Sequence, residues 1–174
     1  MFKKQSVIFL ALVMALTLIA CASGVSEDVV PTDNPEIVES APPTEQEKYG
    51  QISLPDGYTQ VDSATTQDAY MQYENAENNT VVTVVRMEVS GVSLDDVVAI
   101  FKAGLTEEEV ANSSVSDSTV DGIPAKLLEI TGAEGAMKSI YLFEDAASVR
   151  YIQIEHAADG IGERDSIIAN YKAE

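Results

Sequence analysis

Residues Thr80–Val89 read TVVTVVRMEV, and this stretch decides the fold class. β-Branched residues fill most of it, and they favour strands because their side chains pack well on a pleated surface. The valines do not alternate with polar residues, as they would in a strand with one face in solvent. We therefore expect a strand that is buried on both faces and lies inside a sheet.

The residues before this strand predict its first neighbours. Gln51–Leu54 is a short strand candidate that ends at the turn sequence PDG, and Ala69–Glu74 is a weaker candidate. The polar residues Asn75–Asn79 predict a turn that leads into Thr80. Strands that pair in this order form an antiparallel sheet.

An amphipathic helix is expected next. Ser93 is a good N-cap, and two aspartates follow in the first turn, where the helix dipole favours acids. Gly104 would end this helix, and Thr106 with Glu109 has the spacing of a capping box for one more helical turn. Apolar residues recur at helical spacing between these limits, namely Leu94, Val97, Val98, Phe101 and Leu105.

The second half of the domain predicts an antiparallel meander and a closing helix. Asp121-Gly122 is a hairpin signal, and short turns at Gly132–Gly135 and Glu144–Ala147 join the later strands. The strand candidates are Ser116–Val120, Ile123–Thr131, Ala136–Phe143 and Ser148–His156. A sheet of this kind with helices inserted and appended is an α+β architecture.

The closing helix is expected over Ile161–Lys172. Its residues Ile161, Ile168 and Tyr171 have the spacing to face the sheet.

The N-terminus is typical of a secretory signal peptide. Lys3 and Lys4 form a basic start, and the apolar run Val7–Ala20 follows. At about 14 residues this run is too short for a membrane-spanning helix, which needs about 20. Residues 1–20 are therefore predicted to be removed after export.

The end of the signal peptide resembles the lipobox of bacterial lipoproteins, through Leu18-Ile19-Ala20-Cys21. That resemblance implies a diacylglyceryl group on the Cys21 thiol and cleavage between Ala20 and Cys21. Acyl chains such as palmitate would then hold the protein on the extracytoplasmic face of a cell membrane. Cys21 is the only cysteine, so an intramolecular disulfide is excluded.

Composition divides the mature chain into a tether and a domain. Residues 21–48 carry four prolines and many acidic and hydroxyl side chains, so they are expected to be a disordered, extended tether. Residues 49–174 have the length of one ordinary domain. The net charge is −19, and loss of residues 1–20 would make it two units more negative. Such an acidic protein is repelled by phosphate, which argues against a nucleic-acid partner.

The domain resembles the Mog1/PsbP-like fold, which includes small bacterial lipoproteins of unassigned function. The resemblance covers residues 50–172 and is carried by ISLPDGY (52–58), the valine strand and its helix, DGIPAK (121–126), IYLF (140–143), YIQIE (151–155) and the closing helix. One branch of that fold helps to retain calcium and chloride at a photosystem, and another binds a small GTPase. No ligand residue of either branch matches this sequence, so the resemblance implies the fold and leaves the function open.

Little in the sequence points to catalysis. His156 is the only histidine, and it is expected to be a partly exposed residue at a strand end, for which replacement by alanine would change stability little. No G-x-S-x-G nucleophile motif is present, and Ser93 is better explained as a cap. We therefore predict no catalytic residue and no enzyme. The alternative is an envelope hydrolase that uses His156 or a pair of acids.

No cofactor or metal is predicted. One histidine is too few for an ordinary zinc site, and the calcium-loop pattern is absent. Glu107-Glu108-Glu109 reads as a solvated helix start, with a cation site as the alternative. Phosphate-binding glycine motifs are absent too.

The tyrosines allow two readings. Tyr70 and Tyr73 should face opposite sides of their strand, Tyr141 and Phe143 should share a face, and Tyr151 should lie opposite them. Packing in the core is the first reading, and an exposed aromatic platform for a peptide or ligand is the second.

Taken together, these features predict a surface-tethered, non-catalytic lipoprotein that serves as a binding or accessory module. Its partners would be membrane lipid through Cys21 and an envelope protein or small ligand. The ligand-binding residues are not predicted.

Overall fold

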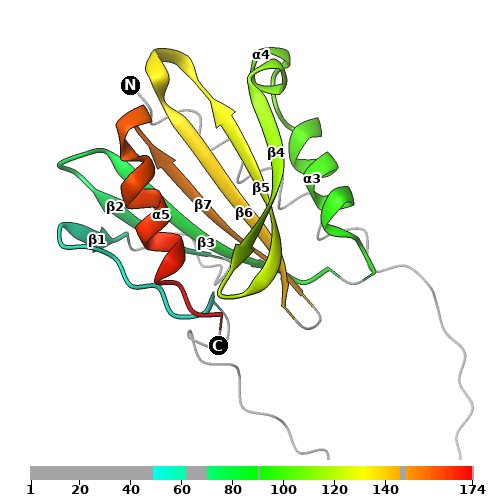
Figure 1. The fold of residues 1–174 in the computed structure, drawn as a ribbon, viewed down its shortest axis with the longest axis horizontal. Coiled ribbons are helices and arrows are strands. Elements are labelled where there is room, and N and C mark those ends of the chain that lie inside the picture. Colours follow the sequence, from blue (N-terminus) through cyan, green and yellow to red (C-terminus); the bar gives the residue numbers. More distant parts are fainter. Residues whose placement is uncertain (1–48, 62–69, 90, 146–147, 174) are drawn as a thin grey trace, which may run out of the picture. The chain divides into compact units, whose positions relative to one another are not determined.

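The computed structural model describes residues 49–61, 70–89, 91–145 and 148–173 of the 174-residue chain. These residues belong to one compact unit, which forms a sheet with helices packed on it (Figure 1). The predicted signal peptide, the lipobox and the tether lie outside the described residues.

The sheet has seven antiparallel strands in the order β1-β2-β3-β7-β6-β5-β4. The valine stretch forms β3 (Thr80–Met87), with β2 on one side and β7 (Ser148–His156) on the other. Val84 and Val85 are both buried although they point to opposite faces. The predicted interior strand is therefore confirmed.

The first predicted strand, Gln51–Leu54, is wrong. Only Gln51 pairs with another strand-like residue, in an isolated bridge to Lys172 near the C-terminus. Ile52 and Leu54 are only partly buried and pack against the core from an irregular segment. The first strand, β1 (Tyr58–Gln60), follows the PDG turn and pairs with β2 (Tyr70–Asn75).

The two predicted helical caps are confirmed. Helix α3 (Leu94–Ala103) begins at Ser93, which forms a capping box with Asp96. Helix α4 (Glu107–Ala111) begins at Thr106, which forms the same arrangement with Glu109. The apolar stripe of α3 packs on the sheet, where Val97, Val98 and Phe101 are buried.

The predicted meander is confirmed with small shifts. Asp121 and Gly122 both have positive φ, 49° and 79°, which a two-residue hairpin turn with matching twist requires. β6 extends to Asp145, which pairs with Ser148, and residues 146–147 lie outside the described part. The strands are β4 (Ser113–Val120), β5 (Ile123–Thr131), β6 (Met137–Asp145) and β7, with a short 3-10 turn at Ala133–Gly135 between β5 and β6.

The closing helix is shorter than predicted. Helix α5 runs over Ile161–Ala169, after a 3-10 turn at Ala158–Gly160. The expectation that Ile161 faces the sheet is wrong, because Ile161 is 42% exposed. The buried face of α5 consists of Arg164, Ile167 and Ile168.

The helices cover opposite faces of the sheet (Figure 1). Phe101 of α3 contacts the Tyr151 ring edge to face, with centroids 5.1 Å apart. Tyr171, just after α5, contacts Phe143 with centroids 5.8 Å apart. Tyr151 pairs with Leu142 across the strands, so it points away from Phe143. The result is the predicted α+β arrangement.

The two ends of the described chain are joined. The Tyr171 hydroxyl donates to the Tyr49 carbonyl oxygen at 2.6 Å, and Gln51 and Lys172 exchange backbone hydrogen bonds of 2.8 and 2.9 Å. Arg150 of β7 donates to the Tyr171 hydroxyl and to the Ala173 carbonyl oxygen. We call these contacts the terminal clasp.

Candidate functional site

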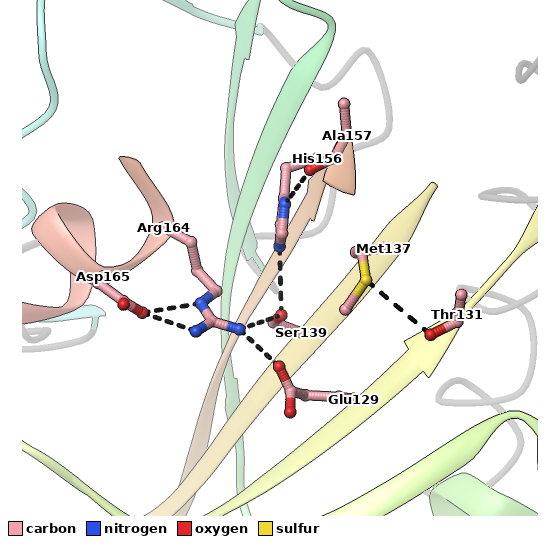
Figure 2. Close-up of polar contacts among 8 residues, drawn as sticks. All are labelled: Glu129, Thr131, Met137, Ser139, His156, Ala157, Arg164 and Asp165. Carbon is pink, nitrogen blue, oxygen red and sulfur yellow. Dashed lines mark hydrogen bonds and ion pairs between the residues drawn. The ribbon is translucent and has the colours of Figure 1, made fainter. Parts of the chain in front are cut away.

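The only histidine is buried at the end of β7. His156 is 4% exposed, so the expectation of a partly exposed residue is wrong. Its Nδ1 lies 2.6 Å from the Ala157 carbonyl oxygen (Figure 2). A carbonyl oxygen only accepts, so Nδ1 carries the proton and, in the neutral ring, Nε2 is an acceptor.

Ser139 of β6 supplies the partner of that acceptor. Its Oγ lies 3.3 Å from His156 Nε2, and the residue is completely buried. A serine hydroxyl that donates to Nε2 of a histidine is the arrangement that activates a serine nucleophile. In such triads a carboxylate holds Nδ1, whereas here a backbone carbonyl takes that place.

Arg164 closes this pair from the side of α5 (Figure 2). Its Nη1 donates to Ser139 Oγ at 3.3 Å and to Glu129 Oε1 at 2.5 Å. Its Nε and Nη2 donate to one oxygen of Asp165, at 2.9 and 2.7 Å. Burial lowers the pKa of Arg164, but the hydrogen bond and charge of Asp165, together with the Glu129 contact, outweigh burial and raise that pKa.

These five side chains form what we call the Arg164 cluster: Glu129, Ser139, His156, Arg164 and Asp165. Three hydrogen bonds of the cluster form a chain in which each residue donates to the next. Arg164 donates to Ser139, Ser139 donates to His156, and His156 donates to Ala157. The side chains of Arg164, Ser139 and His156 therefore each have a hydrogen-bond partner, as buried polar groups require.

The Arg164 cluster gives a substrate no access to the Ser139–His156 pair. Ser139 has no exposed surface, and the guanidinium of Arg164 lies against its hydroxyl. A nucleophile must leave room for a reacting atom near both itself and hydrogen-bond donors for the developing charge. In this arrangement the cluster joins α5 to β5 and β6.

Glu163 attaches α5 to the sheet on its other side. Its carboxylate accepts from the Tyr58 hydroxyl and from the Asn78 side-chain amide, both at 2.7 Å. Burial and the neighbouring Glu163 raise the pKa of Tyr58. Helix α5 is thus held by polar contacts that lie beside its apolar face.

An open groove of about 490 Å³ lies between the β4–β5 hairpin and α5. Burial raises the pKa of Tyr141, whose ring lines the groove, to about 12, so its hydroxyl keeps its proton at neutral pH. At the rim, Lys172 Nζ donates to Asp121 at 2.8 Å. Among the other lining residues Ile168 is apolar, and the rest are polar or small: Ser118, Thr119, Gly122, Asp165 and Ala169.

Burial decides between the two readings for Tyr141, Phe143 and Tyr151. Tyr141 and Phe143 share one face and Tyr151 lies opposite, as predicted. All three are at most 6% exposed, so they pack in the core, and the reading of these rings as an exposed aromatic platform is wrong.

The remaining predicted site residues are not brought together. Ala20 and Cys21 lie outside the described residues. Glu107, Glu108 and Glu109 form the first turn of α4, where Glu109 caps Thr106. Among the described residues, no group of three His, Cys, Asp or Glu side chains is placed to hold a metal. Within the same ranges, no helix has the length and apolar character to cross a membrane.

The sequence analysis missed Ser139 and Arg164. Ser139 alternates with Tyr141 and Phe143 on β6, and this period of two could have placed it on the α5 face. Arg164 lies three and four residues before Ile167 and Ile168, a spacing that places it on their helix face.

No family model and no curated protein sequence matches this chain. Among solved structures, it is similar to the cyanobacterial PsbP (CyanoP) of Synechocystis, with a TM-score of 0.56 and 12% identity over 74% of this chain and 88% of that one. The fold is PsbP-like. The predicted Mog1/PsbP-like resemblance is therefore confirmed for the fold.

A second solved structure is less similar. LpqN of Mycobacterium tuberculosis, described as involved in cell envelope biogenesis, has a TM-score of 0.45 and 10% identity over 70% of this chain and 81% of its own. With so little identity, both likenesses concern the course of the backbone, and a shared fold leaves function open.

Proposed function

We propose that this protein is a lipid-anchored, non-catalytic binding or accessory module on the extracytoplasmic face of a cell membrane. The anchor would be Cys21, exposed by cleavage after Ala20. The acidic, proline-rich residues 21–48 would then hold the PsbP-like domain away from the bilayer.

One observation carries the non-catalytic part of the proposal: the enclosed Ser139–His156 pair. His156 is the only histidine in the chain, so a serine hydrolase of the usual kind would have to use it. Ser139 is fully buried beneath Arg164. The open groove on that face is accessible, and polar side chains such as Lys172 and Asp121 at its rim are suited to hold a ligand.

The anchor is tested by replacing the single cysteine. We expect Cys21→Ser to abolish labelling with palmitate and to release the protein from the membrane fraction of a bacterial host, while Ser23→Ala, a matched control two residues away, stays labelled and membrane-bound. A Cys21→Ser variant that is as lipid-labelled as the parent would overturn the anchoring proposal.

The 3.3 Å Ser139–His156 contact favours one second candidate, an envelope hydrolase in which α5 opens. A broad screen of ester, amide and glycoside substrates should give no activity that depends on Ser139. The decisive variant is Ser139→Ala, because it removes one oxygen atom from the fully buried side chain and adds no bulk. Hydrolysis shown by the parent and lost in folded Ser139→Ala would replace the binding-module proposal with the hydrolase.

A further inference from the structure

Strand β4 is an open edge of the sheet (Figure 1). Its eight residues pair one to one with β5, from Ser113 opposite Ile130 to Val120 opposite Ile123, without a bulge. The strand at the other edge, β1, has only three residues. β4 is thus the long, regular edge.

The backbone groups of β4 that make no hydrogen bond to another described strand alternate along it. Residues of an antiparallel strand point their N–H and C=O groups alternately toward one neighbour and the other. The Asn112 carbonyl accepts from the Thr131 N–H, so even-numbered residues point toward β5. The odd-numbered residues therefore point outward: Ser113, Val115, Asp117 and Thr119.

Of the features that usually protect a sheet edge, β4 carries one, the charged side chain of Asp117. Edge strands are commonly blocked by proline, by charged side chains, by a bulge or by a covering element. The sequence of β4 is SSVSDSTV, in which small hydroxyl side chains leave the backbone accessible. Val115 is 42% exposed and the Asp117 side chain is 89% exposed. These two side chains of β4 are therefore accessible to a partner.

We propose that β4 is a docking edge, to which an extended, positively charged segment of a partner protein adds as an eighth strand. This inference rests on the proposed function as a binding module, and it specifies that the partner binds by strand addition. Main-chain hydrogen bonds would supply affinity, and alternate side chains would supply selectivity.

Charge selects this occupant. The whole chain carries −19, and most of the lysines and arginines that the structure describes already have partners. Lys126, next to β4, lies between Asp95 and Asp117 at 3.2 and 2.8 Å. Glu107 and Glu108 are exposed on α4, which leads directly into β4. A second copy would bring the same negative charge to this edge, whereas a basic segment is attracted to it.

The two faces of an added strand would meet different surfaces. Side chains on the α5 face would lie beside Ser118, which lines the open groove. Side chains on the other face would lie beside Val115 and Asp117, which share their face with Leu128 and Lys126. A segment in which lysine or arginine alternates with a β-branched residue suits these surroundings.

Amide hydrogen exchange tests the proposal. The full chain in detergent is compared with and without a blocked peptide of alternating lysine and valine, as long as β4. We expect the peptide to slow exchange by about tenfold or more at Ser113, Val115, Asp117 and Thr119, which are unprotected alone. The even residues between them should be protected in both samples. High salt should reverse the effect.

Three outcomes would overturn the proposal. The first is the same slowing with a peptide of alternating glutamate and valine. The second is protection of the odd amides without peptide that rises with protein concentration, which indicates a second copy. The third is protection without peptide that disappears when residues 22–48 are deleted, which indicates that the chain covers its own edge.

Two variants separate main-chain pairing from side-chain contact. Val115→Pro removes an outward N–H and no bond to β5, so it should fold and lose peptide binding by at least about tenfold. Val115→Thr keeps the N–H and should bind. If Val115→Pro unfolds, the peptide is methylated instead on the alternate amides that face β4, and loss of binding is again expected; retained binding contradicts the proposal.

This test is independent of the anchor. Failure of Cys21→Ser to release the protein would refute the proposed localisation and leave the exchange pattern of β4 unchanged. An unprotected β4 in the presence of the basic peptide would refute the docking edge, whatever the location of the protein.

Discussion

Ser139 Oγ lies 3.3 Å from His156 Nε2, and the two residues come from neighbouring strands with both side chains enclosed. The imidazole is fixed from both ends, by the Ser139 hydroxyl and by the Ala157 carbonyl. The pair therefore contributes to the packing of α5 on the sheet.

His156→Ala should lower the free energy of unfolding by about 1–3 kcal/mol, because it leaves a cavity and removes the acceptor of the buried Ser139 hydroxyl. The sequence alone predicts a change within about 0.5 kcal/mol, the range of an ordinary surface site. Urea denaturation distinguishes the two values. Asp159→Ala, at an exposed residue of the following turn, is the control and should change stability little.

Arg164→Met should also destabilise the protein, by about 1–3 kcal/mol. It keeps the length of the buried side chain but leaves Glu129 and Ser139 without their charged donor. Lys172→Met removes the ion pair of a more exposed cation and should cost much less. Equal midpoints in urea for Arg164→Met and the parent would show that the Arg164 cluster does not hold α5.

Alkaline pH should destabilise the fold through buried tyrosines. Burial raises the pKa of Tyr141 from 10.0 to about 12 and raises that of Tyr151 further. Above pH 10.0 the folded protein keeps these protons while the unfolded chain loses them. The contribution of the two tyrosines to the free energy of unfolding is therefore fully present below pH 10.0 and is lost as pH rises toward 12. Between pH 10.0 and about 11, phenolate absorbance from these residues should therefore appear together with unfolding. Tyr151→Phe should reduce the pH dependence, and a dependence as steep as the parent's would contradict its assignment.

Gly50→Ala should open the terminal clasp. Gly50 has φ of +76°, and a Cβ there would overlap the Tyr171 hydroxyl and the Lys172 carbonyl oxygen. We expect a loss of about 2 kcal/mol or more from backbone strain and the clash together. Gly91→Ala is the matched control: its φ is +71° with nothing within 4 Å of the added Cβ, so it reports strain alone. Equal effects of the two variants in thermal denaturation would show that the clasp adjusts.

Acid should loosen the C-terminal residues through Asp121. The hydrogen bond from Lys172 and the N–H of Ala173 lower the pKa of this carboxyl below 3.8. Its contribution is therefore present above about that pH and is lost as pH falls through the lowered value. Asp121→Asn should lower the protection factor of the Ala173 amide at neutral pH to the value that the parent reaches only in acid. Unchanged exchange at Ala173 would exclude this contact as a restraint.

Local chemistry explains why much of the fold was predictable. The valines of β3, the caps at Ser93 and Thr106, and the Asp121-Gly122 turn each act on residues close in sequence. Patterns of period two or 3.6 and short-range capping contacts require no knowledge of distant segments.

The Arg164 cluster was not predictable in this way, because it depends on separations that no local pattern encodes. Ser139 meets His156 across 17 residues and Arg164 across 25. His156 ends its strand, which suggested exposure, but α5 returns over it through Gly160, where an added Cβ would lie 3.1 Å from the His156 Cβ. The pairing of Gln51 also depends on a residue far away in the sequence, because it forms an isolated bridge with Lys172.

The terminal clasp determines how the domain would resist a mechanical pull. A force applied to the chain ahead of Tyr49 passes through the Tyr171 hydroxyl to Arg150, which lies on the central strand β7. The short edge strand β1 lies further along the chain, beyond the Gln51–Lys172 bridge. Those hydrogen bonds must break before tension can peel β1 from the sheet, so a domain held by its N-terminal side in moving fluid would bear the load at the centre of its sheet.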